Sequence, residues 1–538
     1  MRLLLGSGLA VVPALALVWA GCGSDDLILP TPFDAGVRAD RIAPPEASDD
    51  GGGGGGSDGG IDAPAGDASV IVGAKDRILL SGTIVTPDQI IVGQVLVEKD
   101  KITCVAPGAG CAGEPGASGA TIVETGGVIS PGLIDTHNHI LFDVFDDSDW
   151  LPLMPYQDHD QWPNEARYQA MLDVKQCLAN DSQGKPTWCA NTPYGNAQGS
   201  LRCELDKWGE LKGLIAGTTS IVGLPGTSAA CFGSLARSVD VSQNGLGSDK
   251  VQTSAIFPPS NATGVCANFA SKTTDAFLVH CGEGLDAKAL AEFTTLGSGS
   301  TPPGCLYAPQ TTITHGAAFT PAEFAKMGAA GMKLTWSPKS NVALYGKTAD
   351  LPAALDAGVL VAIAPDWSMG GSQNLLDELR FADDWDNKNF GNRLTTQDLV
   401  TMATKNAAKV LALGGVIGTI EKGAMADLTV FTGNVGAPYD AIVAATPKQV
   451  RLVMIGGVAL YGDLELAAIA PAAPGCETLD ICQSQKFLCV ATTDKTNKLD
   501  QTYSAIKGAL DKAMTDVDTQ TPNDGWNFAP LAPLVKCN

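Results

Sequence analysis

The stretch PGLIDTHNHI, residues 131–140, is a hydrophobic run that leads into two histidines one residue apart, His137 and His139. The chain has only 5 histidines among 538 residues, so this pair calls for an explanation. Side chains in a strand alternate between its two faces, so both imidazoles share one face if the stretch is extended. If the stretch is a barrel strand, the two histidines lie near its carboxyl end, which is where the active sites of barrel enzymes are built. The pair alone fits a metal site and an ordinary strand about equally well.

Seven similar apolar runs follow, and most are separated by segments long enough for a helix. They are residues 217–224, 235–241, 251–257, 276–281, 311–316, 331–337 and 358–366. Eight runs that alternate with helices predict an α/β fold, a (β/α)8 TIM barrel over residues 129–414. A helix over residues 395–414 is expected to close the barrel, because Thr395 or Thr396 can cap its start and Gly414 suits its end.

Short β-branched runs separated by Gly, Pro and Asp turns lie on both sides of the barrel, in residues 71–128 and 415–462. We predict that they form two parts of one smaller β-sandwich domain. Residues 463–538 form a C-terminal extension with an even number of cysteines, which indicates a segment stapled by disulfides. These cysteines are Cys476, Cys482, Cys489 and Cys537.

The first 22 residues have the features of an export signal, with Arg2 before an apolar run and small residues before Cys22. The end of this segment, WAGC, resembles a bacterial lipobox. It predicts a lipid on Cys22 that anchors the exported chain in the cell envelope, in the periplasm, at the outer membrane or at the cell surface. An ordinary secreted protein and an uncleaved anchor are the alternatives, although the apolar run is short for a membrane span. Residues 23–70 are rich in Gly and Asp and predict a disordered linker.

Charge and cysteine content narrow the class of protein further. The formal charge of −23 comes without a basic cluster that would neutralise phosphates, so nucleic acid is not an expected partner. In an exported chain the cysteines after Cys22 are expected mainly in disulfides, and their odd number leaves at least one unpaired. Cys104 and Cys111 bracket a loop that a disulfide between them would close. Cys281, which follows a histidine in an apolar run, is the expected free thiol.

Three further residues of metal-binding type end later apolar runs. His280, His315 and Asp366 end the fifth, sixth and eighth runs. Neutral imidazole nitrogens and a carboxylate are suitable ligands for Zn²⁺ or a similar divalent ion. Four histidines and an aspartate at the ends of barrel strands are hard to obtain by chance, so together they decide in favour of a metal site. His159, in the long segment after the first run, is either an exposed loop residue or a group that faces the substrate.

Several motifs of this chain occur in the same order in a known group of enzymes. They are GGVISPGLIDTHNH, LVHCGE, ITHG, LTWSPKSNVALYG, IAPDWSMGGSQNLLDELRFA and GTIEKGAMADLTVF. Over residues 76–462 the chain resembles the amidohydrolase superfamily, in the branch of the cytosine deaminases, aminopurine and guanine deaminases and triazine chlorohydrolases. The lipobox, the cysteines and the C-terminal extension depart from the usual intracellular form of that family.

The resemblance implies one divalent metal ion, with Zn²⁺ expected first and Fe²⁺ second. The metal ligands would be His137, His139, His280 and Asp366. Asp366 would accept a proton from the metal-bound water, and His315 would be positioned against that water. Glu283, in HCGE, occupies the position of the glutamate with which the deaminases transfer protons. The family's binuclear members end the fourth strand with a carboxylated lysine, whereas the fourth run here continues into IFPPSN, so one metal is expected.

Hydrolytic deamination of an amino-heterocycle is the favoured reaction because of Glu283. Cleavage of a cyclic amide or ureido group is the alternative, and dehalogenation is a more distant one. A non-catalytic ligand-binding lipoprotein is a different class, but a decayed site would be expected to lose a ligand, and none is missing. The residues expected to contact the small-molecule substrate are Trp336, Ser340, Asn341, Trp367 and His159. Neither the particular substrate nor the oligomeric state follows from the sequence.

Overall fold

The computed structural model describes residues 65–180, 186–223, 235–240, 246, 250–472, 475–493, 495, 498–520 and 527–537, all within the compact unit Gly59–Asn538. The predicted signal peptide 1–22 with Cys22, and the predicted linker up to residue 64, lie outside the described residues. The first strand, β1 (Ser69–Ile71), begins within the last two residues of the predicted linker 23–70. In the described part of the chain, no helix has both the length and the apolar character that a membrane span requires.

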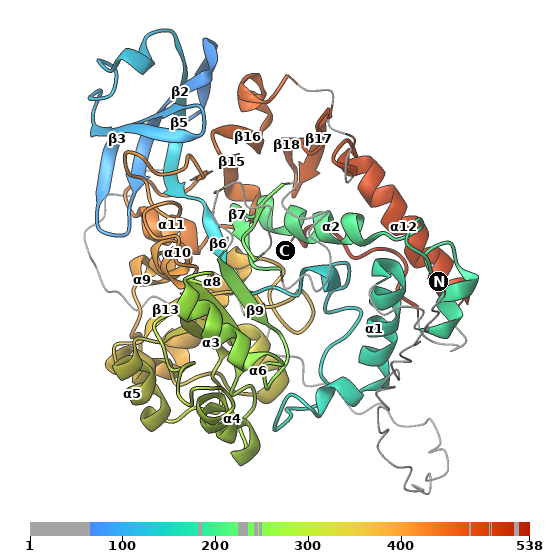
Figure 1. The fold of residues 1–538 in the computed structure, drawn as a ribbon. Helices are drawn as coiled ribbons and strands as arrows, with labels where there is room; N and C mark the ends of the chain where they lie inside the picture. Colours follow the sequence, from blue (N-terminus) through green and yellow to red (C-terminus); the bar gives the residue numbers. More distant parts are fainter. Residues whose placement is uncertain are drawn as a thin grey trace, which may run out of the picture. The chain divides into compact units, whose positions relative to one another are not determined.

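The barrel region contains a parallel strand at each of the eight predicted runs (Figure 1). They are β6 (Leu133–Asp135), β7 (Thr218–Ile221), β8 (Arg237–Ser238), β9 (Val251–Ser254), β10 (Ala276–Cys281), β11 (Thr311–His315), β12 (Lys333–Trp336) and β13 (Leu360–Ile363). β6–β8 form one sheet and β9–β13 form another, each in sequence order. A parallel bridge between Asn138 and Asp366 joins the chain just after β6 to the chain just after β13. The first and eighth strands therefore meet, and the predicted TIM-barrel-like α/β fold is confirmed.

Helices connect the barrel strands, and capping side chains account for where several of them begin. The connecting helices are α1 (Ala166–Ala179), α2 (Arg202–Leu214), α3 (Ala262–Ser271), α4 (Ala287–Ser298), α5 (Pro321–Ala330), α6 (Pro338–Tyr345) and α7 (Leu351–Asp356). Another helix, α8 (Leu375–Trp385), follows the last barrel strand. Asp286 caps α4 by accepting a hydrogen bond from the backbone of the first turn, and Asn374 caps α8 in the same way. Thr320 begins α5 with a complete capping box, and the helix ends at Gly331 with a φ of +68°.

The prediction of one closing helix over residues 395–414 is wrong in one respect, because the structure has two helices there. α9 (Thr396–Met402), capped by Thr395, is followed by α10 (Lys405–Val410), which ends before Gly414. The carbonyl between them, that of Ala403, accepts a hydrogen bond at 2.8 Å from the backbone N–H of Ile134 in β6. The next residue, Thr404, has a φ of −131° and a ψ of −91°, outside the helical region, so the helix breaks there.

Strands from both sides of the barrel combine in one ten-stranded sheet (Figure 1). Its members before and after the barrel include β2 (Ala74–Val85), β3 (Ile90–Glu98), β4 (Lys101–Pro107), β5 (Ala120–Pro131), β14 (Leu428–Phe431), β15 (Val450–Ile455) and β16 (Val458–Asp463). β5, which leads into the barrel, pairs antiparallel with β14, which follows it. Ile78, Val95 and Leu452 belong to one buried apolar cluster of this sheet. That the sheet folds as a β-sandwich domain stays a prediction.

The C-terminal extension joins this sheet. β17 (Cys476–Ile481) and β18 (Ser484–Cys489) form a hairpin whose second strand pairs with β16. Helix α12 (Tyr503–Gln520) packs along α2, where the rings of Trp208 and Tyr503 stack with centroids 6.2 Å apart. Disulfides link Cys476 to Cys489 and Cys482 to Cys537, which confirms the predicted stapling.

The remaining cysteines of the described chain agree in part with expectation. The disulfide predicted between Cys104 and Cys111 is present, and Cys281 is a buried free thiol as predicted. Two further disulfides that the sequence did not identify link Cys177 to Cys189 and Cys266 to Cys305.

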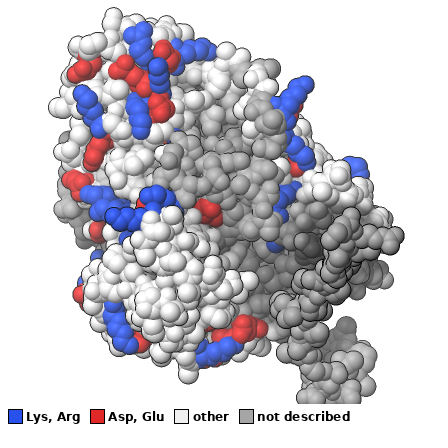
Figure 2. Space-filling view, viewed as in Figure 1, with Lys and Arg blue, Asp and Glu red and all other residues white. Residues whose placement is uncertain are grey.

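Charge is distributed unevenly on the face of the molecule shown in Figure 2. Lys and Arg side chains alternate with Asp and Glu over the upper part, where β2, β3 and β5 lie. The region over α3 and its preceding strand is almost bare of charge in the same view, and residues 251–271 contain no charged side chain. The described part of this face therefore carries no extended area of a single charge.

Candidate metal centre

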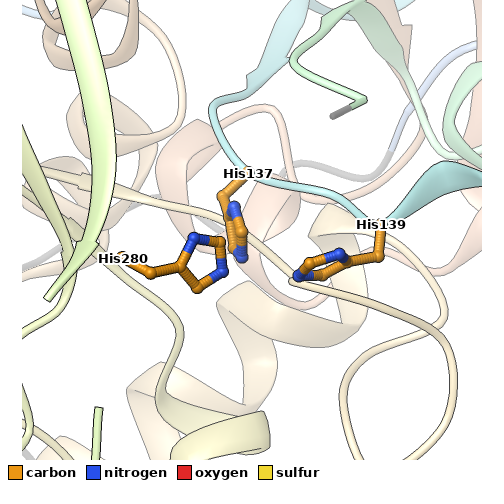
Figure 3. A group of neighbouring side chains, drawn as sticks. All are labelled: His137, His139 and His280. Atoms are coloured by element: carbon orange, nitrogen blue, oxygen red, sulfur yellow. The ribbon is translucent and has the colours of Figure 1, made fainter. Parts of the chain in front are cut away.

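Three of the predicted ligands converge at the carboxyl ends of the barrel strands (Figure 3). His137 and His139 follow β6, and His280 lies within β10 near its end. The centroid of the His137 ring lies 5.0 Å from that of His139 and 4.6 Å from that of His280. Their ligand atoms all lie within 4.8 Å of one another. The histidine pair was expected within the first strand, but β6 ends at Asp135 and both residues lie in the segment that follows it, where their rings nevertheless come together.

Asp366 and His315 complete the group. Asp366 Oδ1 lies 2.9 Å from His137 Nε2 and 3.5 Å from His139 Nε2. The ring of His315 lies 5.0 Å from that of His280. His315 has a φ of +73° and Asp366 a φ of +71°, in the left-handed region that non-glycine residues rarely adopt. Such conformations cost about 1–3 kcal/mol each and concentrate at functional sites.

The buried atoms of this group fit a bound cation. His137 Nε2 and Asp366 Oδ1 are both buried, and neither has a hydrogen-bond partner although they lie only 2.9 Å apart. A buried polar atom without a partner is costly, and nearly all such atoms in folded proteins are satisfied. Imidazole nitrogens together with a carboxylate oxygen are a donor set that suits Zn²⁺. A divalent ion at this place would satisfy both atoms at once.

The protonation of the histidines favours the same interpretation. Burial lowers the pKa of His137 and of His139 well below the usual range, and it lowers the pKa of His280 to about 4. All three imidazoles are therefore neutral at neutral pH, which is the state that binds a metal. His280 Nδ1 donates to the backbone carbonyl of Ser254 at 3.2 Å, which leaves its Nε2 as the ligand atom. His139 is the most accessible member, with 24% of its side chain exposed.

His315 is oriented by Asn341. The Nδ1 atom of His315 lies 2.9 Å from Asn341 Oδ1, which can only accept, so Nδ1 carries the proton. The Nδ2 group of Asn341 donates to Thr348 Oγ1 at 3.2 Å, which fixes the amide. The remaining nitrogen of His315, Nε2, lies 3.8 Å from Glu283 Oε2. Asn341, predicted to contact substrate, has both ends of its amide engaged with protein groups, and its role toward substrate stays a prediction.

Glu283 lies beside the group, as the sequence pattern predicted. Its side chain is buried, with the residue only 7% exposed, and its Oε2 atom lies 3.8 Å from His315 Nε2. The other carboxylate oxygen, Oε1, accepts a hydrogen bond of 2.7 Å from the hydroxyl of Tyr345. One oxygen of Glu283 is therefore held by the protein and the other faces the metal-binding group.

The predicted substrate-contacting residues fall in different environments. Trp367 is buried and its ring lies 5.5 Å from that of His139, next to the group. The indole N–H of Trp336 donates to Thr348, and the hydroxyl of Ser340 donates to the backbone of Ser337, so these polar atoms are engaged inside the protein. Substrate contact by these residues stays a prediction.

His159 is part of a partly buried ion pair. Its Nε2 atom lies 2.7 Å from Glu292 Oε1, and the other oxygen of Glu292 accepts from the backbone N–H of Gly282 at 2.7 Å. The hydrogen bond to Glu292 raises the pKa of His159 to about 9, so the imidazole is protonated at neutral pH. His159 thus joins the segment after β6 to the turn after β10, and a direct contact with substrate stays a prediction.

An aromatic cluster that joins the segment after β6 to Trp367 was not predicted from the sequence. The rings of Trp150, Trp162, Tyr168 and Trp367 pack with centroid separations of 4.9 to 6.1 Å. Glu165 holds the segment together, because Trp150 Nε1 and the backbone N–H of Leu153 donate to its two oxygens at 2.7 and 3.0 Å. The signal for this cluster was present as six aromatic residues within residues 142–168.

A family model and several curated proteins match parts of this chain. Residues 265–460 match the model of the amidohydrolase family. The chain is 24% identical over 432 residues to the 5'-deoxyadenosine deaminase of Methanothermobacter thermautotrophicus, which covers 73% of this chain and 95% of that protein. It is 28% identical over 175 residues to the 5-methylthioadenosine/S-adenosylhomocysteine deaminase of Nitratidesulfovibrio vulgaris, over 29% of this chain and 38% of that protein.

Solved structures resemble the fold at low sequence identity. Atrazine chlorohydrolase from Arthrobacter aurescens TC1, complexed with zinc, has a TM-score of 0.52 at 16% identity, over 74% of this chain and 97% of that one. Guanine deaminase of E. coli has a TM-score of 0.51 at 14% identity, over 71% and 99%. The family match and the deaminase and hydrolase relatives together support a hydrolase that acts on carbon–nitrogen bonds. The grouped histidines and aspartate suggest a divalent metal.

Proposed function

We propose that this protein is a metal-dependent hydrolase that deaminates an amino-heterocycle, with Zn²⁺ as its ion. The observation that carries the proposal is the pair of buried unpartnered atoms, His137 Nε2 and Asp366 Oδ1, with Glu283 and His315 directly beside them. The two curated relatives described above support the same reaction class, since those proteins are deaminases of adenosine-type compounds.

His137, His139, His280 and Asp366 would hold the ion. When bound, the ion supplies an activated water by lowering the pKa of that water far below its value in bulk solution, to near neutrality. Asp366 would accept the proton that the water gives up, and His315 would orient the attacking oxygen through its Nε2.

Glu283 is placed to move a second proton. Its free oxygen, Oε2, is the one that faces His315 and the metal-binding group. Deamination adds water to the ring carbon and releases ammonia, so the ring nitrogen and the departing amine each need a proton in turn. A carboxylate with one oxygen held by the protein and one directed at the site can deliver and recover that proton without leaving its position.

The test is a product assay with metal-loaded protein. Aminopurines, adenosine-type nucleosides, amino-triazines, cyclic amides and cyclic ureides are incubated with it, while ammonia, ring-opened acid and halide are measured separately. We expect ammonia from at least one aminated heterocycle and none after the metal is removed with a chelator. Ring-opened product without ammonia would replace deamination by cyclic amide or ureido hydrolysis, and no turnover of any compound would overturn the proposal.

We also propose that the chain is exported and anchored by a lipid on Cys22. The sequence of residues 1–22 supports this, and so do the disulfides of the described chain, because disulfides persist in oxidising compartments. The test is incorporation of labelled fatty acid into the expressed protein and its loss in the Cys22→Ala variant. Equal labelling of both proteins, or of neither, would contradict the anchor.

A further inference from the structure

A chain of hydrogen bonds outside the predicted site residues ends on Glu283. Trp162 Nε1 donates to the hydroxyl oxygen of Tyr345 at 3.0 Å, and the hydroxyl of Tyr345 donates to Glu283 Oε1 at 2.7 Å. The three residues come from different parts of the barrel: Trp162 from η3 (Trp162–Asn164) after β6, Tyr345 from the end of α6, and Glu283 from the turn after β10. All three side chains are buried.

The direction of each bond follows from the chemistry of the donors. An indole N–H can only donate, so the oxygen of Tyr345 is its acceptor. Burial raises the pKa of Tyr345 well above its usual range, so this hydroxyl keeps its proton, and that proton is directed at Glu283 Oε1. Because Oε1 already accepts the hydrogen bond of Tyr345, Oε2 is the oxygen left available to carry a proton toward the site.

The proton of Glu283 is useful on Oε2 because of where this oxygen lies. Oε2 is the oxygen of Glu283 that lies 3.8 Å from His315 Nε2, on the side of the metal-binding group. A carboxylate that is free to rotate would present either oxygen to the site. The proton would then face the substrate only part of the time. With Oε1 fixed, the proton-carrying oxygen is always the one that faces the site.

We propose that Tyr345, itself aligned by Trp162, is a positioning residue that fixes which oxygen of Glu283 exchanges a proton with the substrate. This inference rests on the proposed function for the role of Glu283, but the contact that it concerns stands independently of the substrate. Tyr345 acts through Glu283 and is not expected to touch the reacting atoms. Trp162 has the smaller role, because it acts through Tyr345.

The kinetic test compares Tyr345→Phe with the wild type. The variant keeps the buried ring and removes only the hydroxyl, so we expect kcat to fall about 10- to 100-fold while KM changes by less than about twofold. In a Glu283→Gln background the same substitution is expected to change kcat by less than about twofold, because the partner it acts through is gone. Trp162→Phe should lower kcat in the same direction by less than Tyr345→Phe.

Tyr439→Phe is the matched control. Tyr439 is also a buried tyrosine whose hydroxyl donates a hydrogen bond, but its acceptor is the backbone of Thr86, directly after β2. We expect this variant to keep the wild-type kcat. An unchanged kcat in Tyr345→Phe, or an equal loss in the presence and absence of Glu283, would overturn the inference.

A crystal structure of Tyr345→Phe tests the contact without any substrate. We expect the carboxylate of Glu283 to leave the position that it has in the wild type, or to occupy more than one position. A carboxylate that stays in place without the hydroxyl would overturn the inference. A wild-type protein that releases no ammonia would instead overturn the proposed function, so the two failures are distinguishable.

Discussion

The carboxyl end of the barrel and the ten-stranded sheet both bury charged side chains, but they treat them differently. Where the sheet meets the barrel, Asp427, which directly precedes β14, accepts from Arg237 of β8 at 2.7 and 2.9 Å and from the backbone N–H of Gly456 at 2.7 Å. Lys486, fully buried, donates to two backbone carbonyls and to Asp463. At the barrel end, His137 Nε2 and Asp366 Oδ1 are buried with no such partner. The paired charges of Asp427 and Lys486 stabilise the fold, whereas the two unpaired atoms at the barrel end are available to bind a ligand.

The substitution with the largest expected effect is Asp366→Asn. It removes a negative ligand and the proton acceptor but preserves shape, so we expect activity to fall by about 10³-fold or more and the bound metal to decrease. Initial rates and metal content of the purified variant measure this. Because the barrel end gains little stability from Asp366, the free energy of unfolding of the metal-free protein should change little. A large loss of stability would break the distinction between the two regions.

The next largest effect is expected from Asp427→Asn, the counterpart where the sheet meets the barrel. Removing one partner of a buried ion pair leaves the guanidinium of Arg237 poorly compensated, which typically costs about 3–5 kcal/mol of unfolding free energy. Denaturant unfolding measures the loss, and the folded fraction should retain its activity per molecule. Asp88→Asn, which alters an exposed pair with Lys405, serves as control and should cost less than about 1 kcal/mol.

Metal binding gives a third, intermediate effect. An ion that binds only the folded state at 100 times its dissociation constant stabilises the protein by about 2.7 kcal/mol. We expect an increase of this order when metal is added to the metal-free protein, and a smaller one in Asp366→Asn. Unfolding curves with metal and with chelator measure it. The same increase in both proteins would place the ion elsewhere.

The smallest effect concerns the ion pair between His159 and Glu292. The pKa of His159 is about 9 in the folded protein, above its usual value of 6.5. Its contribution to stability is therefore fully present below about pH 6.5 and is lost as the pH rises through about 9. Because the histidine side chain is 21% exposed, solvent screening reduces the contribution to about 1 kcal/mol. The difference in unfolding free energy between wild type and His159→Gln should shrink over this pH range, and a constant difference would contradict the pairing.

Most of the barrel and of the metal group was predictable because each depends on a local pattern. Apolar runs placed the strands, and residues at strand ends such as His280 and Asp366 meet wherever parallel strands form one barrel. The contacts of Tyr345 were not predictable, because Trp162 and Glu283 reach it from loops whose course no local pattern describes. The break after Ala403 was missed for a similar reason, since the carbonyl of Ala403 bonds to Ile134, far away in sequence.

The hairpin β17–β18 has a consequence for association between copies of the chain. By pairing with β16, it covers a strand whose free backbone groups would otherwise offer a template for another chain. The outer strand becomes β17, which carries Glu477 and Asp480 and is joined to its neighbour by the disulfide Cys476–Cys489. Negative charge on an outer strand discourages pairing with a second sheet. The C-terminal extension therefore disfavours aggregation through strand pairing at this edge of the sheet.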